Sequence, residues 1–199
     1  TTGSPRFARD DTSEASGELN LEQKKILLQI AKETVEQFVT TGQKKSFDVR
    51  DERLNWKEGA FVTLHQDGKL RGCIGQIVQS LKPLLKVVRD MAIEAATDDP
   101  RFSPVAKDDL EHLEYEVSVL SRPEEIDNWQ DIELGKHGVI ISRGLFNKGV
   151  FLPQVADETN WTLEEFLAHL AHDKAGLKAD AYKDKDVKLE VFTAQVVKE

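Results

Sequence analysis

The fold is decided by residues 60–75, which read AFVTLHQDGKLRGCIG. Apolar and polar side chains alternate on both sides of Asp67-Gly68, as they do in strands with one buried face. Asp-Gly is a dipeptide whose two residues accept the positive φ angles of a two-residue hairpin turn. The stretch therefore predicts an antiparallel hairpin, with the segment Arg71-Gly72-Cys73-Ile74-Gly75 on its second strand.

Helix and strand patterns surround this hairpin. Apolar side chains repeat at helical spacing in residues 20–42, 80–98 and 162–176, with Ser80 as the predicted cap of the second segment. Capping boxes open the first and the third of these segments. Apolar or alternating runs predict further strands at residues 115–119, 139–142, 150–152 and 189–197. Hairpins interspersed with helices indicate an α/β fold of the α+β type, with a mainly antiparallel sheet flanked by helices.

Two parts of unequal length are expected along the chain. Residues 1–19 are rich in Thr, Ser, Gly and acidic side chains and contain few apolar groups, so they cannot offset the entropy cost of ordering. We predict a flexible acidic tail there. Residues 20–199 have the length and apolar content of one folded domain that needs neither disulfides nor a metal.

The composition excludes several classes of partner. The net charge of −9 at neutral pH repels nucleic-acid phosphates and anionic lipids, and no basic patch compensates for it. Apolar runs stay shorter than the roughly 18 residues of a membrane span. Cys73 is the only cysteine, so an intrachain disulfide is impossible and a reducing, cytoplasmic location is expected. We therefore expect neither nucleic-acid binding nor membrane insertion.

The Cys73 segment carries the strongest chemical signal. Strand alternation places Arg71 and Cys73 on one open face and Leu70 on the opposite, core face. A neighbouring guanidinium favours the thiolate, so we predict a Cys73 pKa below that of an ordinary thiol. Gly72 and Gly75 leave room for a substrate, and their amides can form an anion-binding concavity. Alternatively, the cysteine simply packs and the glycines permit a bulge.

Six blocks in order along the chain give a more specific signal than this segment alone. Together they resemble the AMMECR domain family over residues 21–197. The resemblance implies one α/β domain with a larger and a smaller lobe, and a cleft between the lobes that the Arg-Gly-Cys-Ile-Gly segment faces. It also implies an association with a Memo-type protein and a radical S-adenosylmethionine enzyme, as in a three-part microbial system. The blocks are Leu70-Arg71-Gly72-Cys73-Ile74-Gly75, Asp99-Pro100-Arg101-Phe102, Glu116-x-Ser118-Val119-Leu120, His137-Gly138-Val139, Gly149-x-Phe151-Leu152-Pro153-Gln154-Val155 and Lys174-Ala175-Gly176-Leu177.

The resemblance further implies a set of cleft residues. Cys73 and Glu116 are candidate catalytic groups. His172 joins them, at a position where many relatives have a second cysteine, so a mechanism that needs two thiols is doubtful here. Several of the cleft residues also have an alternative, structural role. Arg101 and Glu116 can form an ion pair, Gln154 can cap backbone groups, and Lys174 can complement a helix dipole. The candidate substrate-binding residues are Arg71, Gly72, Gly75, Arg101, Gln154 and Lys174.

Neither a metal nor another cofactor is expected. His169, His172 and Asp173 share one helix face, but no further ligand cluster accompanies them, and a polar helix face explains them better. Core or lobe-packing positions, rather than a stacking platform for bases, are expected for Trp56, Trp129 and Trp161.

Two functional classes fit these residues. In the first, the protein is an enzyme or a covalent carrier: Cys73 attacks or holds a small molecule, an arginine binds its negative group, and Glu116 or His172 moves protons. In the second, a binding or adaptor module holds a partner protein or a small anionic ligand in the same cleft without chemistry. The first class requires an accessible thiolate and the second does not. Nucleic-acid binding ranks third because of the acidic charge.

Overall fold

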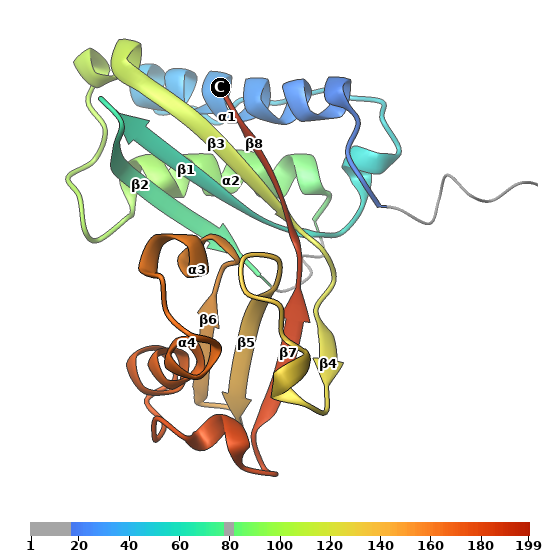
Figure 1. Ribbon diagram of the computed structural model, residues 1–199. Coiled ribbons are helices and arrows are strands. Elements are labelled where there is room, and N and C mark those ends of the chain that lie inside the picture. Colours follow the sequence, from blue (N-terminus) through green and yellow to red (C-terminus); the bar gives the residue numbers. More distant parts are fainter. Residues whose placement is uncertain (1–16, 78–81) are drawn as a thin grey trace, which may run out of the picture.

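Two antiparallel sheets form the frame of the molecule. The computed structural model describes residues 17–77 and 82–199. One sheet has the strand order β2-β1-β3-β8 and the other β4-β7-β5-β6, and each sheet with its helices makes one lobe (Figure 1). The predicted α+β class and its antiparallel pairing are confirmed. The elements are α1 (Leu21–Thr41), β1 (Gly59–Gln66), β2 (Lys69–Gln76), α2 (Leu84–Thr97), β3 (Leu113–Leu120), β4 (Glu124–Ile126), β5 (Gly138–Arg143), β6 (Asn147–Phe151), α3 (Gln154–Thr159), α4 (Leu163–His169), β7 (Lys188–Phe192) and β8 (Ala194–Lys198).

Helices α1 and α2 cover one face of the first sheet. α2 packs on β1 and β2, and α1 packs on α2 and β3. Val62 and Leu64 are fully buried in this core, whereas Thr63 between them is half-buried on the other face. The predicted capping box of Asn20 and Gln23 opens α1, with both reciprocal hydrogen bonds present. The predicted cap of the second helix, Ser80, lies outside the described residues. No helix in the described ranges is long and apolar enough to cross a membrane.

The predicted hairpin is present, with one departure from regular alternation. Residues 67–68 turn the chain from β1 to β2 with φ angles of 53° and 70°. Leu70 and Gly72 pair with consecutive residues of β1, so Arg71 between them is the extra residue of a β-bulge. The expected core position of Leu70 is therefore wrong, and its side chain is 39% exposed.

The smaller lobe packs the second sheet against α3 and α4. Phe166 and Leu167 of α4 are fully buried against Val139 and Ile141 of β5. The predicted capping box opens α4, and the helix continues into a π-helical turn, Leu170–Lys174. This lobe therefore has its own apolar core, separate from the core under α1 and α2.

Two chain segments cross together from one lobe to the other. β3 leads into β4, and β7 leads into β8 (Figure 1). The sequence predicts a single strand over residues 189–197, but the strand is interrupted at Thr193, where the chain changes sheets. At this crossing the Ser121 amide donates to the Thr193 carbonyl, and the Thr193 amide donates to Ser121 Oγ. Leu120 and Phe192 are buried beside this crossing. The two lobes are therefore joined by a pair of hydrogen-bonded segments that pack against a small apolar cluster.

The N-terminal boundary of the domain differs from the prediction. Most of the predicted tail, residues 1–16, lies outside the described residues. Leu19, however, is only 4% exposed, and its amide donates to Gln195 Oε1. The carbonyl of Gly17 accepts hydrogen bonds from Gln195 Nε2 and from the Arg53 guanidinium. Residues 17–19 thus belong to the folded unit, because they bury apolar surface and make hydrogen bonds with distant residues.

Candidate functional site

Cys73 lies on the face of the first sheet that the helices leave uncovered. Its partner across β1 is Thr63, and Thr63 in turn pairs with Glu116 on β3. Side chains of directly paired residues point to the same side of an antiparallel sheet, so these three form one row. All three are half-buried, and Thr63 Oγ1 donates a hydrogen bond to Cys73 Sγ over 3.2 Å. We call Cys73, Thr63 and Glu116 the thiol row.

A buried carboxylate holds the backbone of Cys73. Asp99, with a side chain only 2% exposed, accepts hydrogen bonds from the amides of Cys73 and Arg101 over 2.9 and 3.1 Å. The Arg101 guanidinium donates to both Asp99 oxygens and, over 3.4 Å, to the Cys73 carbonyl. The guanidinium and the two amides hold the pKa of the Asp99 carboxyl well below its usual range. Arg101 therefore pairs with Asp99, not with Glu116, and presents no free positive charge.

The protonation state of Cys73 differs from the prediction. Burial raises the pKa of the Cys73 thiol. The Thr63 hydrogen bond and the charge of Arg101 oppose this effect, whereas the carboxylates of Asp99 and Glu116 add to it. The predicted low pKa is therefore wrong, and Cys73 is a protonated thiol at neutral pH.

Arg71, the cation expected beside this thiol, points elsewhere. Its guanidinium donates to the carbonyls of Ser103 and Pro104 over 2.7 and 3.2 Å and pairs with Asp109 over 3.2 Å. The bulge at Arg71 breaks the alternation that would have placed it next to Cys73. Arg71 therefore ties the segment after α2 to β2 and does not activate the thiol.

Close packing explains both glycines of the segment. A Cβ on Gly72 would lie 2.1 Å from the carbonyl oxygen of Ala95, so Gly72 permits the close approach of α2. A Cβ on Gly75 would lie 2.1 Å from the ring of Phe61, which covers Gly75 on the face of the thiol row. The room that the sequence assigned to a substrate above Gly75 is thus filled by the Phe61 ring.

Glu116 is the charged member of the thiol row. Its carboxylate makes no ion pair or hydrogen bond with any residue that the structure describes. Lys198 faces it from β8 in register, beyond ion-pair distance. A cavity of about 230 Å³ opens beside Glu116, with Glu114 and His65 also in its lining. A half-buried carboxylate without a partner is available to a ligand or to a proton.

Gln154 connects the smaller lobe to this face. It is the first residue of α3, and its Nε2 donates to Ser118 Oγ over 3.3 Å. Ser118 lies two residues after Glu116 on β3 and is 2% exposed. Gln154 Oε1 is buried and accepts no hydrogen bond from the described residues. The structure therefore brings Gln154 to the face that carries Cys73 and Glu116.

Comparisons with known proteins identify the family. The AMMECR1 family model matches residues 28–197. The chain belongs to the AMMECR1 family. It is 40% identical over 190 residues to protein MK0488 of Methanopyrus kandleri, covering 91% of this chain and 90% of that protein. It is 39% identical over 189 residues to protein MJ0810 of Methanocaldococcus jannaschii, covering 91% and 92%. The crystal structure of the uncharacterized protein PH0010 from Pyrococcus horikoshii matches with a TM-score of 0.83 at 36% identity, covering 89% of this chain and 92% of that one.

Two residues predicted for the cleft of this AMMECR1 protein lie on the smaller lobe. Lys174 ends the π-helical turn, and its Nζ lies 5.8 Å from the ring centroid of Phe151. Gly149 packs closely against Lys174, because a Cβ atom added to Gly149 would lie 2.7 Å from Lys174 Cβ. His172 in the same turn is 70% exposed, and its Nδ1 lies 2.8 Å from Asp173. Within the described ranges neither residue contacts the thiol row, so the structure does not bring His172 to the thiol.

One carboxylate, that of Asp173, holds the imidazoles of His169 at the end of α4 and of His172 in the π-helical turn. Asp173 lies 2.7 Å from His169 Nδ1 and 2.8 Å from His172 Nδ1. The His169 ring also stacks on Trp161, with centroids 4.0 Å apart. Among residues 17–77 and 82–199, no three His, Cys, Asp or Glu side chains gather as metal ligands would. Packing and hydrogen bonding account for the positions of His169, His172 and Asp173.

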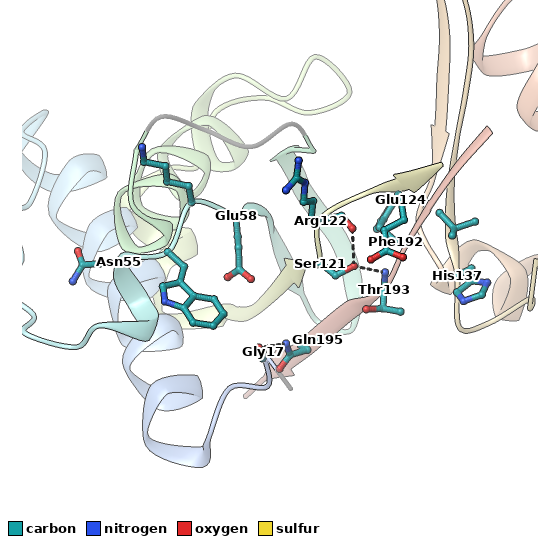
Figure 2. A pocket seen from close by; sticks show the side chains of 13 residues that line it. Gly17, Asn55, Glu58, Ser121, Arg122, Glu124, His137, Phe192, Thr193 and Gln195 are labelled. Atoms are coloured by element: carbon teal, nitrogen blue, oxygen red, sulfur yellow. Dashed lines mark hydrogen bonds between the residues drawn. The ribbon is translucent and has the colours of Figure 1, made fainter. Parts of the chain in front are cut away.

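A larger cavity lies on the other side of the crossing strands. Its volume is about 900 Å³, and both lobes contribute to its lining (Figure 2). Gln195 lines it and pairs in register with Val119, whose side chain belongs to the core under the helices. The cavity and the thiol row are therefore on opposite faces of the sheet. We call it the junction cavity, and its lining includes Trp56, Lys57, Glu58, Arg122, Glu124, His137 and Thr193.

Sequence reasoning missed Thr63 and Asp99. Counting outward from the turn at residues 67–68 pairs Cys73 with Val62, and only the bulge moves the pairing to Thr63. Asp99 belongs to one of the blocks that match the AMMECR1 family, where only Arg101 received a role. An aspartate just beyond a helix end, two residues before an arginine, could have been recognised as its ion-pair partner.

Proposed function

We propose that the protein acts on a small molecule through the Cys73 thiol, as an enzyme or a covalent carrier. The observation that supports this function is the thiol row, in which Thr63 lies in register between Cys73 and Glu116, and the Glu116 carboxylate has no ion pair with a described residue. A nucleophile and a general base that share one half-buried face are the two groups that covalent catalysis requires. Gln154 borders this face from the smaller lobe.

In this proposal Glu116 is the base. Burial, and to a smaller extent the charge of Glu116, disfavours the thiolate, so Cys73 keeps its proton until a substrate lies against the row. Thr63 Oγ1 now donates to the sulfur; after rotation it passes its own proton to Glu116 and takes the proton of the breaking S–H bond. The sulfur electron pair then forms a bond to an electrophilic carbon, such as that of a carbonyl group, whose π electron pair moves onto its oxygen.

A binding module without chemistry is the second candidate. The observation that favours it is the burial of Cys73, which raises the pKa of its thiol, together with the ion pairs of Arg71 and Arg101 with Asp109 and Asp99. In this function the row holds a ligand or a segment of a partner protein by hydrogen bonds. A Memo-type protein and a radical S-adenosylmethionine enzyme stay predicted partners under either function.

The Glu116→Gln variant separates the two functions by the sign of its effect. The probe is p-nitrophenyl acetate, and mass spectrometry measures the rate of acetyl transfer to Cys73 at neutral pH. If Glu116 only places a charge near the thiol, its loss lowers the thiol pKa and speeds acetylation. If Glu116 is the base, its loss slows acetylation, and a general base contributes on the order of 10²-fold or more.

We expect at least a ten-fold slower acetylation in Glu116→Gln. Glu22→Gln, an exposed glutamate in the first turn of α1, outside the cavity beside Glu116, is the matched control and should change the rate little. Cys73→Ser should form no thioester. Faster acetylation in Glu116→Gln than in the parent protein would rule out the catalytic function and leave the binding module.

A further inference from the structure

We propose that the junction cavity binds a small organic anion that carries a planar ring. This site is distinct from the thiol row, because the sheet separates the two. A volume of about 900 Å³ is in the range of cavities that enclose a cofactor-sized or drug-sized molecule. The class of ligand follows from the aromatic surface, the charges and the hydrogen-bond donors of the lining.

Trp56 supplies an exposed aromatic surface. It is 38% exposed, unlike most large apolar side chains of the protein, and this departs from the packing role that the sequence predicts for it. The Arg53 guanidinium lies 4.4 Å from the centroid of the ring and is itself only 9% exposed. Arg53 is fixed by the carbonyl of Gly17 and by Glu58. The indole is therefore held in place before any ligand arrives, which suits the stacking of a planar ring.

The charges that remain free in the cavity favour an anion. The Glu58 carboxylate is neutralised by its ion pair with Arg53. Lys57 and Arg122, in contrast, are exposed and have no carboxylate within ion-pair distance in the part of the chain that the structure describes. Glu124 is the remaining carboxylate of the lining. Within the described residues, this lining thus holds two cations without an ion pair, Lys57 and Arg122, and one carboxylate without an ion pair, Glu124, in a chain whose overall charge is −9.

The hydrogen-bond donors of the cavity support the same ligand class. The Glu133 amide donates to His137 Nδ1 over 3.1 Å, which leaves Nε2 as the ring nitrogen that can donate a hydrogen bond to a ligand. That N–H donates to no described residue. Thr193, between the two lobes in Figure 2, also has a hydroxyl without a described partner. His137 begins the His-Gly-Val block, to which the chemistry of the thiol row assigns no role.

Calorimetric titration of the full chain with matched pairs of probes tests the proposal. Adenosine monophosphate and indole-3-carboxylate each combine a planar ring with an anionic group. Adenosine and indole-3-carboxamide have the ring alone, and inorganic phosphate has the charge alone. We expect at least one ringed anion to bind more tightly than its neutral counterpart and more tightly than phosphate, and its affinity to fall with added salt.

Variants of the lining locate the binding. Trp56→Ala should weaken it roughly five-fold to a hundred-fold, the range of ring stacking on an aromatic side chain, and Trp56→Phe should weaken it less. Arg122→Gln should weaken it about two- to five-fold, as expected for an exposed ion pair, and should flatten its salt dependence. Lys107→Gln, an exposed cation outside the cavity, is the charge-matched control.

Three results would overturn the proposal: no binding of either ringed anion, equal binding of the neutral probes, or binding that Trp56→Ala and Arg122→Gln leave unchanged. None of them bears on the thiol row, because acetylation of Cys73 reports on the opposite face.

Discussion

Replacement of Asp99 by alanine should destabilise the protein by about 3 kcal/mol. The carboxylate accepts hydrogen bonds from two backbone amides and from one guanidinium, and it is nearly inaccessible to solvent. Hydrogen bonds to a charged group contribute about 1.5–3 kcal/mol each, and an amide left buried without an acceptor costs about 1–3 kcal/mol. The side chain of Arg101 is 55% exposed and can be hydrated again, so its contribution is discounted and the two amides provide most of the effect.

Urea unfolding of Asp99→Ala and Asp99→Asn measures this effect. Asparagine keeps an acceptor for one amide and should cost less, about 1–2 kcal/mol. The folded-state pKa of Asp99 is depressed, so its stabilisation is present above the unfolded pKa of about 4 and is lost as the pH falls below that value. The stability gap between the parent protein and Asp99→Asn should therefore narrow from pH 6 to pH 3. A loss below about 1 kcal/mol for Asp99→Ala, or a gap independent of pH, would refute this reasoning.

Three further results are expected. The ratio of the Cys73 reaction rates with a cationic and an anionic methanethiosulfonate reagent should be roughly three-fold or more higher in the native protein than in the unfolded chain. Glu116→Gln should lower this ratio. An equal or lower ratio in the native protein would show that another charge dominates. Gly72→Ala should lower the free energy of unfolding in urea by about 1–3 kcal/mol, because the added Cβ would clash with the carbonyl of Ala95. An unchanged free energy of unfolding would mean that α2 shifts freely. Gln154→Ala should cost about 1 kcal/mol and increase hydrogen exchange at the start of α3, whereas unchanged exchange there would argue against a role in joining the lobes.

Local signals predicted most of the elements of this fold. The capping boxes at Asn20 and Thr162 satisfy backbone amides within one turn of the chain, so their effect can be recognised from a few neighbouring residues. The same holds for the turn at residues 67–68, whose positive φ angles Asp-Gly accepts. The division into two sheets was not predictable in this way, because the apolar pattern runs without a break across Thr193, and the change of sheet there depends on the partner strands.

The position of the candidate site was predictable from the sequence, but the ion pairing of its charged residues was not. The family resemblance implies one cleft for Cys73 and Glu116, and in the structure both residues lie on one face of the sheet. The state of each cation depends on which carboxylate pairs with it. Arg71 pairs with Asp109, which is 38 residues away along the chain, and Arg101 pairs with Asp99, two residues before it. Both arginines near the thiol are thereby neutralised, so the anion-binding cleft expected there lacks its cations. Among the residues that the structure describes, Lys57 and Arg122 are cations without an ion pair, and both line the junction cavity on the opposite face, where the carboxylate of Glu58 is itself neutralised. Counting charges along a sequence therefore does not show which cations lack an ion pair, whereas the pairing of each arginine in the structure does.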